Sequence, residues 1–179
     1  MLRATAGVMA RNTSFSLKLI LENIKRMTSN QAFTDQSVYL SILTATPAQE
    51  VKYFVEALLA RLSAVQVAVQ VINSRTGLAM LPFTDSVKGI TFHLGETLLA
   101  EAHVRVGDQA GYAACLGRDL EQAIALAIVD ALMQSKAATA KAEQRAILDF
   151  VATAAQQQQA EEMALLEKIE ATRVELETF

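Results

Sequence analysis

The chain is poor in the residues that build cross-links and metal centres. Its 179 residues include one cysteine and two histidines, so an internal disulfide is excluded and a zinc or iron–sulfur site within this chain alone is not expected. His93 and Cys115 each lie singly in an apolar stretch, where a place in the core is the more common role. Tryptophan is absent, and seven glycines and two prolines are too few for a loop-rich or disordered body.

Long apolar runs are missing as well. The longest, residues 62–74, contains Gln66 and Gln70 and falls short of the ~18 residues that span a bilayer. We therefore expect a soluble, cytoplasmic protein with no membrane partner. Although 52 % of the residues are hydrophobic, 31 are alanines and only ten are aromatic, which favours one domain of closely packed helices.

Charge divides the chain into two parts. Residues 1–26 hold five basic residues and one acidic residue, whereas the remainder holds 11 basic and 18 acidic residues. Such an acidic body gives no support to nucleic-acid binding. We interpret residues 1–32 as a basic extension and residues 33–179 as a single domain. The extension is either a variable or disordered tail translated from an early start codon, with Met27 as the alternative first residue, or an amphipathic helix that contacts a partner or a membrane.

Helices are predicted from apolar residues that recur every three or four positions. One is expected near residues 37–43 and another over 48–62, with Thr46 accepting hydrogen bonds at the start of the second. Asp119, followed by Gln122, has the spacing of a helix cap, and the helix that it starts, to about Ser135, is apolar on nearly every side and should be central. Residues 137–177 lack glycine and proline and predict one long helix or two stacked helices.

Strands are predicted from alternating polarity. Five are expected, at residues 65–72, 78–83, 89–94, 97–106 and 112–116. Turn residues separate them at 73–77, at 95–96 and at 107–111. Such short connections make the sheet antiparallel. The sequence therefore predicts an α+β fold in which an antiparallel sheet of about four to five strands packs against an N-terminal helix and a central helix, with a long C-terminal helical arm.

Two small groups of polar residues are the candidate sites. Glu101, His103 and Arg105 alternate onto one face of a predicted strand and could supply an acid, a base and an anion binder. The outer face of an antiparallel sheet carries charges in any case, so a solvated or interface role is the alternative. Arg118 and Asp119, where the sheet passes into a helix, are a candidate anion-binding or interface site. Arg118 could bind an anion beside the start of the helix, or it could tie the loop to a neighbouring carboxylate.

Asp130 stands in the middle of the predicted central helix. A buried ionised carboxylate is costly unless it is paired, so we expect a partner for it, for instance an arginine, or a place at an interface. Signatures of nucleotide loops, zinc proteases and paired cysteines are all missing. Composition and spacing therefore name no function by themselves.

Several segments resemble a known family in order and spacing. They are residues 95–106, Gly111-Tyr112, Gly117-Arg118-Asp119 and residues 129–134, together with residues 76–78 and 171–174. This pattern is similar to PhnG, a subunit of the bacterial carbon–phosphorus lyase core complex that degrades phosphonates. The resemblance covers roughly residues 33–179, and the N-terminal extension departs from it.

The resemblance implies a subunit of alpha-D-ribose 1-methylphosphonate 5-triphosphate synthase. That assembly, with subunits of the PhnI, PhnH and PhnJ types and a PhnL-like ATPase, uses ATP as substrate and replaces its adenine with an alkylphosphonate. The chain itself would be a noncatalytic partner of PhnI, with no cofactor and no metal of its own. The competing hypothesis is a free-standing homodimeric α+β domain that binds a metabolite through the face of Glu101, His103 and Arg105.

Overall fold

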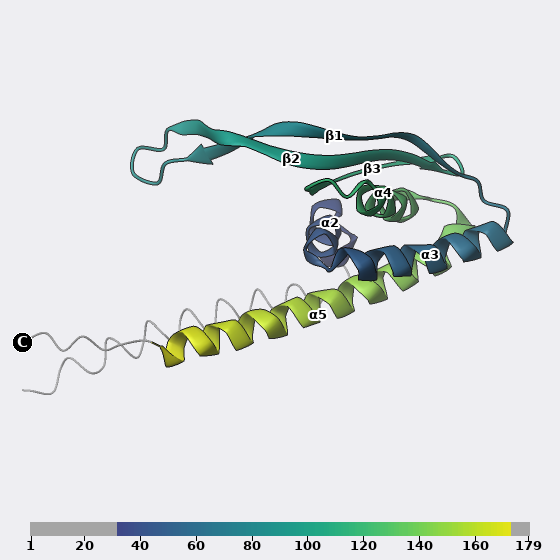
Figure 1. Ribbon diagram of the computed structural model, residues 1–179. Coiled ribbons are helices and arrows are strands. Elements are labelled where there is room, and N and C mark those ends of the chain that lie inside the picture. Colours follow the sequence, from purple (N-terminus) through teal and green to yellow (C-terminus); the bar gives the residue numbers. More distant parts are fainter. Residues whose placement is uncertain (1–31, 173–179) are drawn as a thin grey trace, which may run out of the picture.

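The computed structural model describes residues 32–172, so the predictions for the basic extension lie mostly outside the described residues. The chain folds into three layers, which Figure 1 shows from the side. A three-stranded sheet lies on helix α4 (Leu120–Gln134), and α4 in turn lies on the layer of α2 (Gln36–Ala45), α3 (Ala48–Ala64) and α5 (Lys141–Ala171). Short 3-10 turns, Ala32–Thr34 and Ala138–Ala140, precede α2 and α5. The predicted α+β class is confirmed.

The helices follow the apolar periodicity of the sequence. Helix α3 buries Val51, Val55, Leu58 and Leu62 along one side, and nearly all of α4 is buried, as expected for a central helix. The described part of the region after residue 137 forms one long helix, α5, rather than two. The prediction that Thr46 caps α3 was wrong, because its hydroxyl donates to the carbonyl of Ile42 (2.9 Å) and so closes the end of α2.

The sheet has fewer and longer strands than predicted. Strand β1 (Val69–Thr84) pairs antiparallel with β2 (Thr91–Val106), and β2 pairs with β3 (Gln109–Leu116). The order β1-β2-β3 follows the chain. The real hairpin turn lies at residues 85–90, where the carboxylate of Asp85 accepts from the backbone N–H groups of Val87 (3.1 Å) and Lys88 (3.0 Å).

The two turns predicted at residues 73–77 and 95–96 were therefore wrong. The β1–β2 register shifts between Val71 and Asn73 and again between Leu81 and Pro82, opposite Gly95. These shifts are β-bulges, which insert a residue without ending the pairing. Turn-forming residue types in long hairpin strands thus mark bulges here. The third predicted turn is confirmed in place but shortened to Gly107-Asp108, because β3 already begins at Gln109.

Close packing joins α4 to the sheet. A Cβ atom on Gly111 of β3 would lie 2.2 Å from the carbonyl oxygen of Ala127 and 2.5 Å from the backbone nitrogen of Ala131. Only glycine permits that approach. Alanines on the facing surfaces, Ala102 and Ala113 among them, are buried in the same layer. The alanine-rich composition therefore serves a close contact between helix and sheet.

Candidate functional site

The face of the sheet away from α4 carries the predicted polar group. Ala102, Val104 and Val106 of β2 are buried, while His103 and Arg105 are exposed and Glu101 is half-buried on the opposite side of the strand. The predicted alternation is thus confirmed. The role of these three residues remains a prediction.

The partners of Glu101 come from the two neighbouring strands. Its carboxylate accepts from the guanidinium of Arg75, which stands opposite on β1, and from the hydroxyl of Tyr112 on β3 (3.0 Å). The Arg75 bond, and after it the Tyr112 bond, hold the pKa of Glu101 below its usual value. A carboxylate held ionised by two donors is a poor general acid at neutral pH.

The histidine of this group lies against an aromatic ring. The rings of His103 and Tyr112 are 4.6 Å apart between centroids and are tilted. Arg105 makes no ion pair within residues 32–172; the arginine of the cluster is Arg75 instead. Sequence reasoning missed Arg75 and Tyr112, because their approach to Glu101 depends on the strand register.

The junction between β3 and α4 is built around Asp119. Its carboxylate accepts from the backbone N–H of Gln122 (2.9 Å), which confirms the predicted cap, and it pairs with Lys52 of α3 (2.9 Å). The Lys52 bond is the main reason that the pKa of Asp119 is lowered. The anion position at the helix start is thereby filled by the protein's own carboxylate. Arg118 is exposed beside it, and its part in binding an anion or a partner stays a prediction.

Asp130 lies at the centre of a buried hydrogen-bond network. Its carboxylate accepts from the side chains of Gln36 (2.8 Å), Tyr39 (2.6 Å) and Gln134 (2.8 Å) and from the backbone N–H of Tyr112 (2.9 Å). The suggested arginine partner was wrong, since all four donors are neutral. Burial, and then the Asp130 bond, raise the pKa of Tyr39. The network joins α2, β3 and α4 and therefore stabilises the body.

The two soft ligands have different surroundings. Cys115 is buried, as expected, and burial raises the pKa of its thiol, which makes it a weak nucleophile. His93 is exposed on the hairpin, so the expectation that it belongs to the core was wrong. Within residues 32–172, the histidine, cysteine and acidic side chains form no group of three or more that could hold a metal ion.

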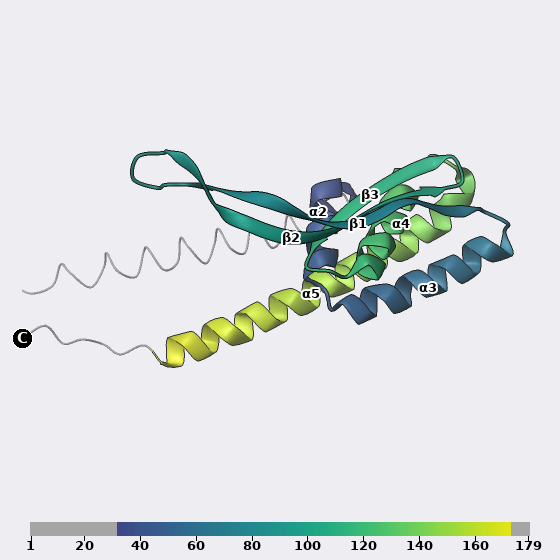
Figure 2. The ribbon, with the colours of Figure 1, turned by 45° about the horizontal axis from the view of Figure 1, so that its top comes forward.

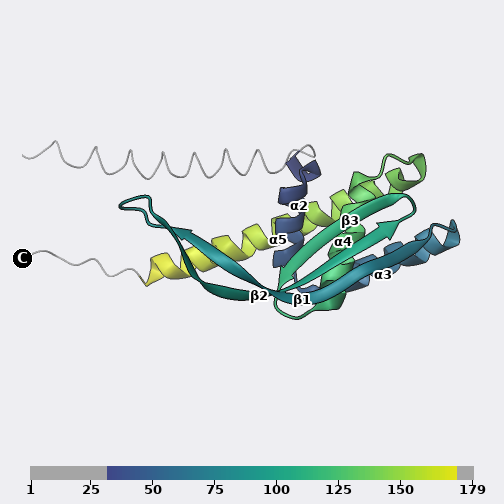
Figure 3. The same cartoon turned by 90° about the horizontal axis from the view of Figure 1, so that it is seen from above.

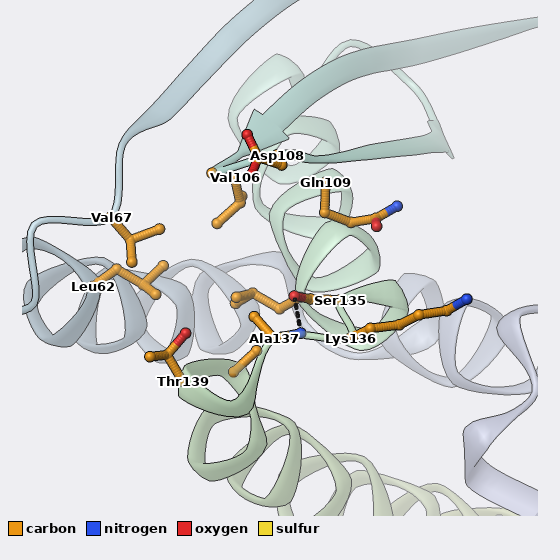
Figure 4. A pocket seen from close by; sticks show the side chains of 12 residues that line it. Leu62, Val67, Val106, Asp108, Gln109, Ser135, Lys136, Ala137 and Thr139 are labelled. Atoms are coloured by element: carbon orange, nitrogen blue, oxygen red, sulfur yellow. Dashed lines mark hydrogen bonds between the residues drawn. The ribbon is translucent and has the colours of Figure 1, made fainter.

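A cavity of about 370 Å³ opens where α3, the β2–β3 turn and the link from α4 to α5 meet. Figure 4 shows Leu62, Val67 and Val106 on its apolar wall, with Lys136 directed away from it. Ser135 accepts from the backbone N–H of Ala137 (3.3 Å). The residues that line the cavity provide apolar contact surface, but they do not place a nucleophile next to a base.

Apolar side chains also gather on two projecting arms. We define the hairpin arm as residues 78–94, which expose eight large apolar side chains: Leu78, Met80, Leu81, Phe83, Val87, Ile90, Phe92 and Leu94, at 44–86 %. We define the helical arm as residues 161–171 of α5, with Met163, Leu165, Leu166 and Ile169 exposed at 56–58 %. Exposed apolar surface on this scale normally marks an interaction site.

No helix within residues 32–172 is long and apolar enough to cross a membrane. Comparison with curated protein sequences gives no significant match. A protein-family model described as "Phosphonate metabolism protein PhnG" matches residues 35–179, which is most of the chain. The chain therefore belongs to the PhnG family and has a role in phosphonate metabolism.

Proposed function

We propose that the chain is a noncatalytic subunit of the carbon–phosphorus lyase core assembly. In that role it supports a PhnI-type subunit while an alkylphosphonate oxygen forms a bond to C1 of the ribose of ATP. The bond from that carbon to adenine breaks, adenine leaves with a proton, and ribose 1-alkylphosphonate 5-triphosphate is the product. The proposed partners also include subunits of the PhnH and PhnJ types and a PhnL-like ATPase. We propose that the assembly works in the cytoplasm.

The observation that supports this proposal best is the exposed apolar surface of the two arms. At roughly 150–200 Å² for a large side chain, the exposed fractions of the eight hairpin-arm residues correspond to an apolar surface on the order of 700–900 Å². A standard protein interface buries about 800 Å² on each partner. A chain that functioned alone would have no use for so much exposed apolar surface.

The polar clusters of the body support a structural role. Glu101 is engaged by Arg75 and Tyr112, Asp119 by Lys52, and Asp130 by four neutral donors. Each carboxylate thus has a structural partner already, and none stands beside an activated nucleophile. We retain Arg118 as the residue of this chain that contacts an anionic substrate or a partner carboxylate, because it is the exposed cation beside the α4 cap.

Co-expression with the other core subunits, followed by native mass analysis, tests the proposal. The expected result is a stable hetero-oligomer that contains this chain and a PhnI-type subunit. A homodimer that ignores the other subunits and binds a small metabolite would overturn it. The Glu101, His103 and Arg105 face would then become the leading binding site.

A further inference from the structure

The helical arm extends a face that is buried elsewhere in α5. Leu165 follows Ile147 by 18 residues, which is five full turns at 3.6 residues per turn, and Ile169 follows Val151 by the same number. Ile147 and Val151 are fully buried against the body. The side of α5 that packs on the body therefore continues for about two more turns, with nothing in residues 32–172 to cover it.

The hairpin arm extends the sheet in the same manner. Strand β3 pairs only with Leu99–Val106 of β2, so beyond Leu99 the sheet narrows to two strands. Ser74 stands opposite buried Ala102, and by alternation Leu78 and Met80 of β1 lie on that same face. A two-stranded ribbon is marginally stable in water without a partner surface.

Both arms project from the same end of the body. Figures 1, 2 and 3 show the hairpin tip and the end of α5 on one side in all three views. The faces that continue the core on each arm are therefore available to one binding partner. Two such contacts on one partner would reinforce each other, because the second forms at a high effective concentration.

Charge indicates the chemistry of that partner. Residues 161–171 contain four glutamates and one lysine, so the helical arm is acidic. Glu161 lies about 40° to one side of Leu165 around the helix and Glu162 about 60° to the other, whereas Glu167 lies on the far side, about 160° away. Acidic residues thus border the apolar stripe, and a second copy of the chain would bring the same charges against them, which is unfavourable.

We propose that both arms bind one subunit of a different kind, whose contact surface carries lysine or arginine next to aliphatic side chains. This inference rests on the proposed function, because it names the surface by which the chain joins the assembly. The basic partner neutralises Glu161 and Glu162 while its apolar residues cover Leu165, Ile169, Leu78 and Met80.

The test co-expresses the full chain with the core subunits, purifies the chain and measures which subunits are recovered with it. Four variants are compared with the wild type. Two double variants place aspartates on the arms: Leu165→Asp with Ile169→Asp on the helical arm, and Leu78→Asp with Met80→Asp on the hairpin arm. Each should reduce the amount of the partner subunit recovered with the chain tenfold or more, and the subunit lost should be the same in both. Glu161→Lys with Glu162→Lys should do so as well, since like charges then meet. Glu167→Lys, the matched control on the far side of the helix, should retain the subunit at the wild-type level. Circular dichroism checks that each variant is folded.

The outcomes separate the two proposals. A wild-type chain that captures none of the core subunits overturns the proposed function. If the wild type captures them but the two arm variants lose different subunits, the proposal that both arms bind a single partner is wrong. Unchanged capture by the Glu161→Lys, Glu162→Lys variant contradicts a basic partner, whether the true occupant is a second copy or the chain's own basic extension. Light scattering of the chain alone then distinguishes those two, as a dimer or a monomer.

Discussion

Replacing Asp130 with asparagine tests the buried network that holds the body together. The variant keeps one oxygen, which can still accept from Tyr39 and Gln36. Its new amide group, however, faces the backbone N–H of Tyr112 and the side-chain amide of Gln134, both of which donate to Asp130. Gln134 is exposed and can turn to water, so Tyr112 is left with a buried unsatisfied donor.

The expected cost follows from these contacts. A buried donor without an acceptor costs about 1–3 kcal/mol, and the two bonds that remain lose their charge assistance, about 0.5–1 kcal/mol each. We therefore expect Asp130→Asn to lower the free energy of unfolding by about 2–5 kcal/mol. With a urea slope of about 2 kcal/mol/M, the midpoint should fall by roughly 1–2.5 M.

Urea denaturation followed by circular dichroism measures this change. Tyr39→Phe removes one donor and leaves three, so its effect should be smaller, about 1.5–3 kcal/mol. Burying an ionised carboxylate also costs free energy. An asparagine variant as stable as the wild type, or more stable, would show that this cost equals or outweighs the stabilisation from the four bonds, contrary to the loss of stability expected here.

Three further predictions concern the packing and the polar junction. Gly111→Ala should cost about 3 kcal/mol because α4 cannot approach β3; a melting temperature within about 2 °C of the wild type would contradict that contact. Lys52 lowers the pKa of Asp119, so this ion pair stabilises the fold above pH ~4 and is lost as the pH falls through the lowered folded pKa. Lys52→Met should therefore narrow the difference in stability between pH 7 and pH 3, and an unchanged difference would count against the pair. Arg118→Ala should leave the melting temperature unchanged but reduce phosphonate turnover by the assembled complex; the opposite pattern would make Arg118 structural.

Local patterns in the sequence predict the helices well. The stripe from Val51 to Leu62 and the apolar run of α4 each bury the surface that their periodicity indicates. The Asp119 cap was predicted because its partner is only three residues away. Wherever a feature depends on neighbours within one or two helical turns, its chemistry can be read directly from the sequence.

Features that depend on distant residues could not be predicted in this way. Asn73 and Gly95 are residue types that are common in turns. In the structure both lie at bulges, and the paired strands continue past them. Glu101 meets Arg75 across that register, 26 residues away. Asp130 meets Tyr39 over 91 residues. Only the packed structure brings such partners together, although the Asp85 to Gly89 segment was a turn signal that could have located the hairpin.

In the proposed assembly this chain supports catalysis without performing it. The decisive measurement is the release of adenine from ATP in the presence of methylphosphonate, made for the purified chain, for the other core subunits without it, and for the full set. We expect no release by the chain alone, little or none by the other subunits without it, and rapid release by the full set. Adenine release by the purified chain alone would contradict a noncatalytic role, and full activity of the other subunits in its absence would contradict a supporting one.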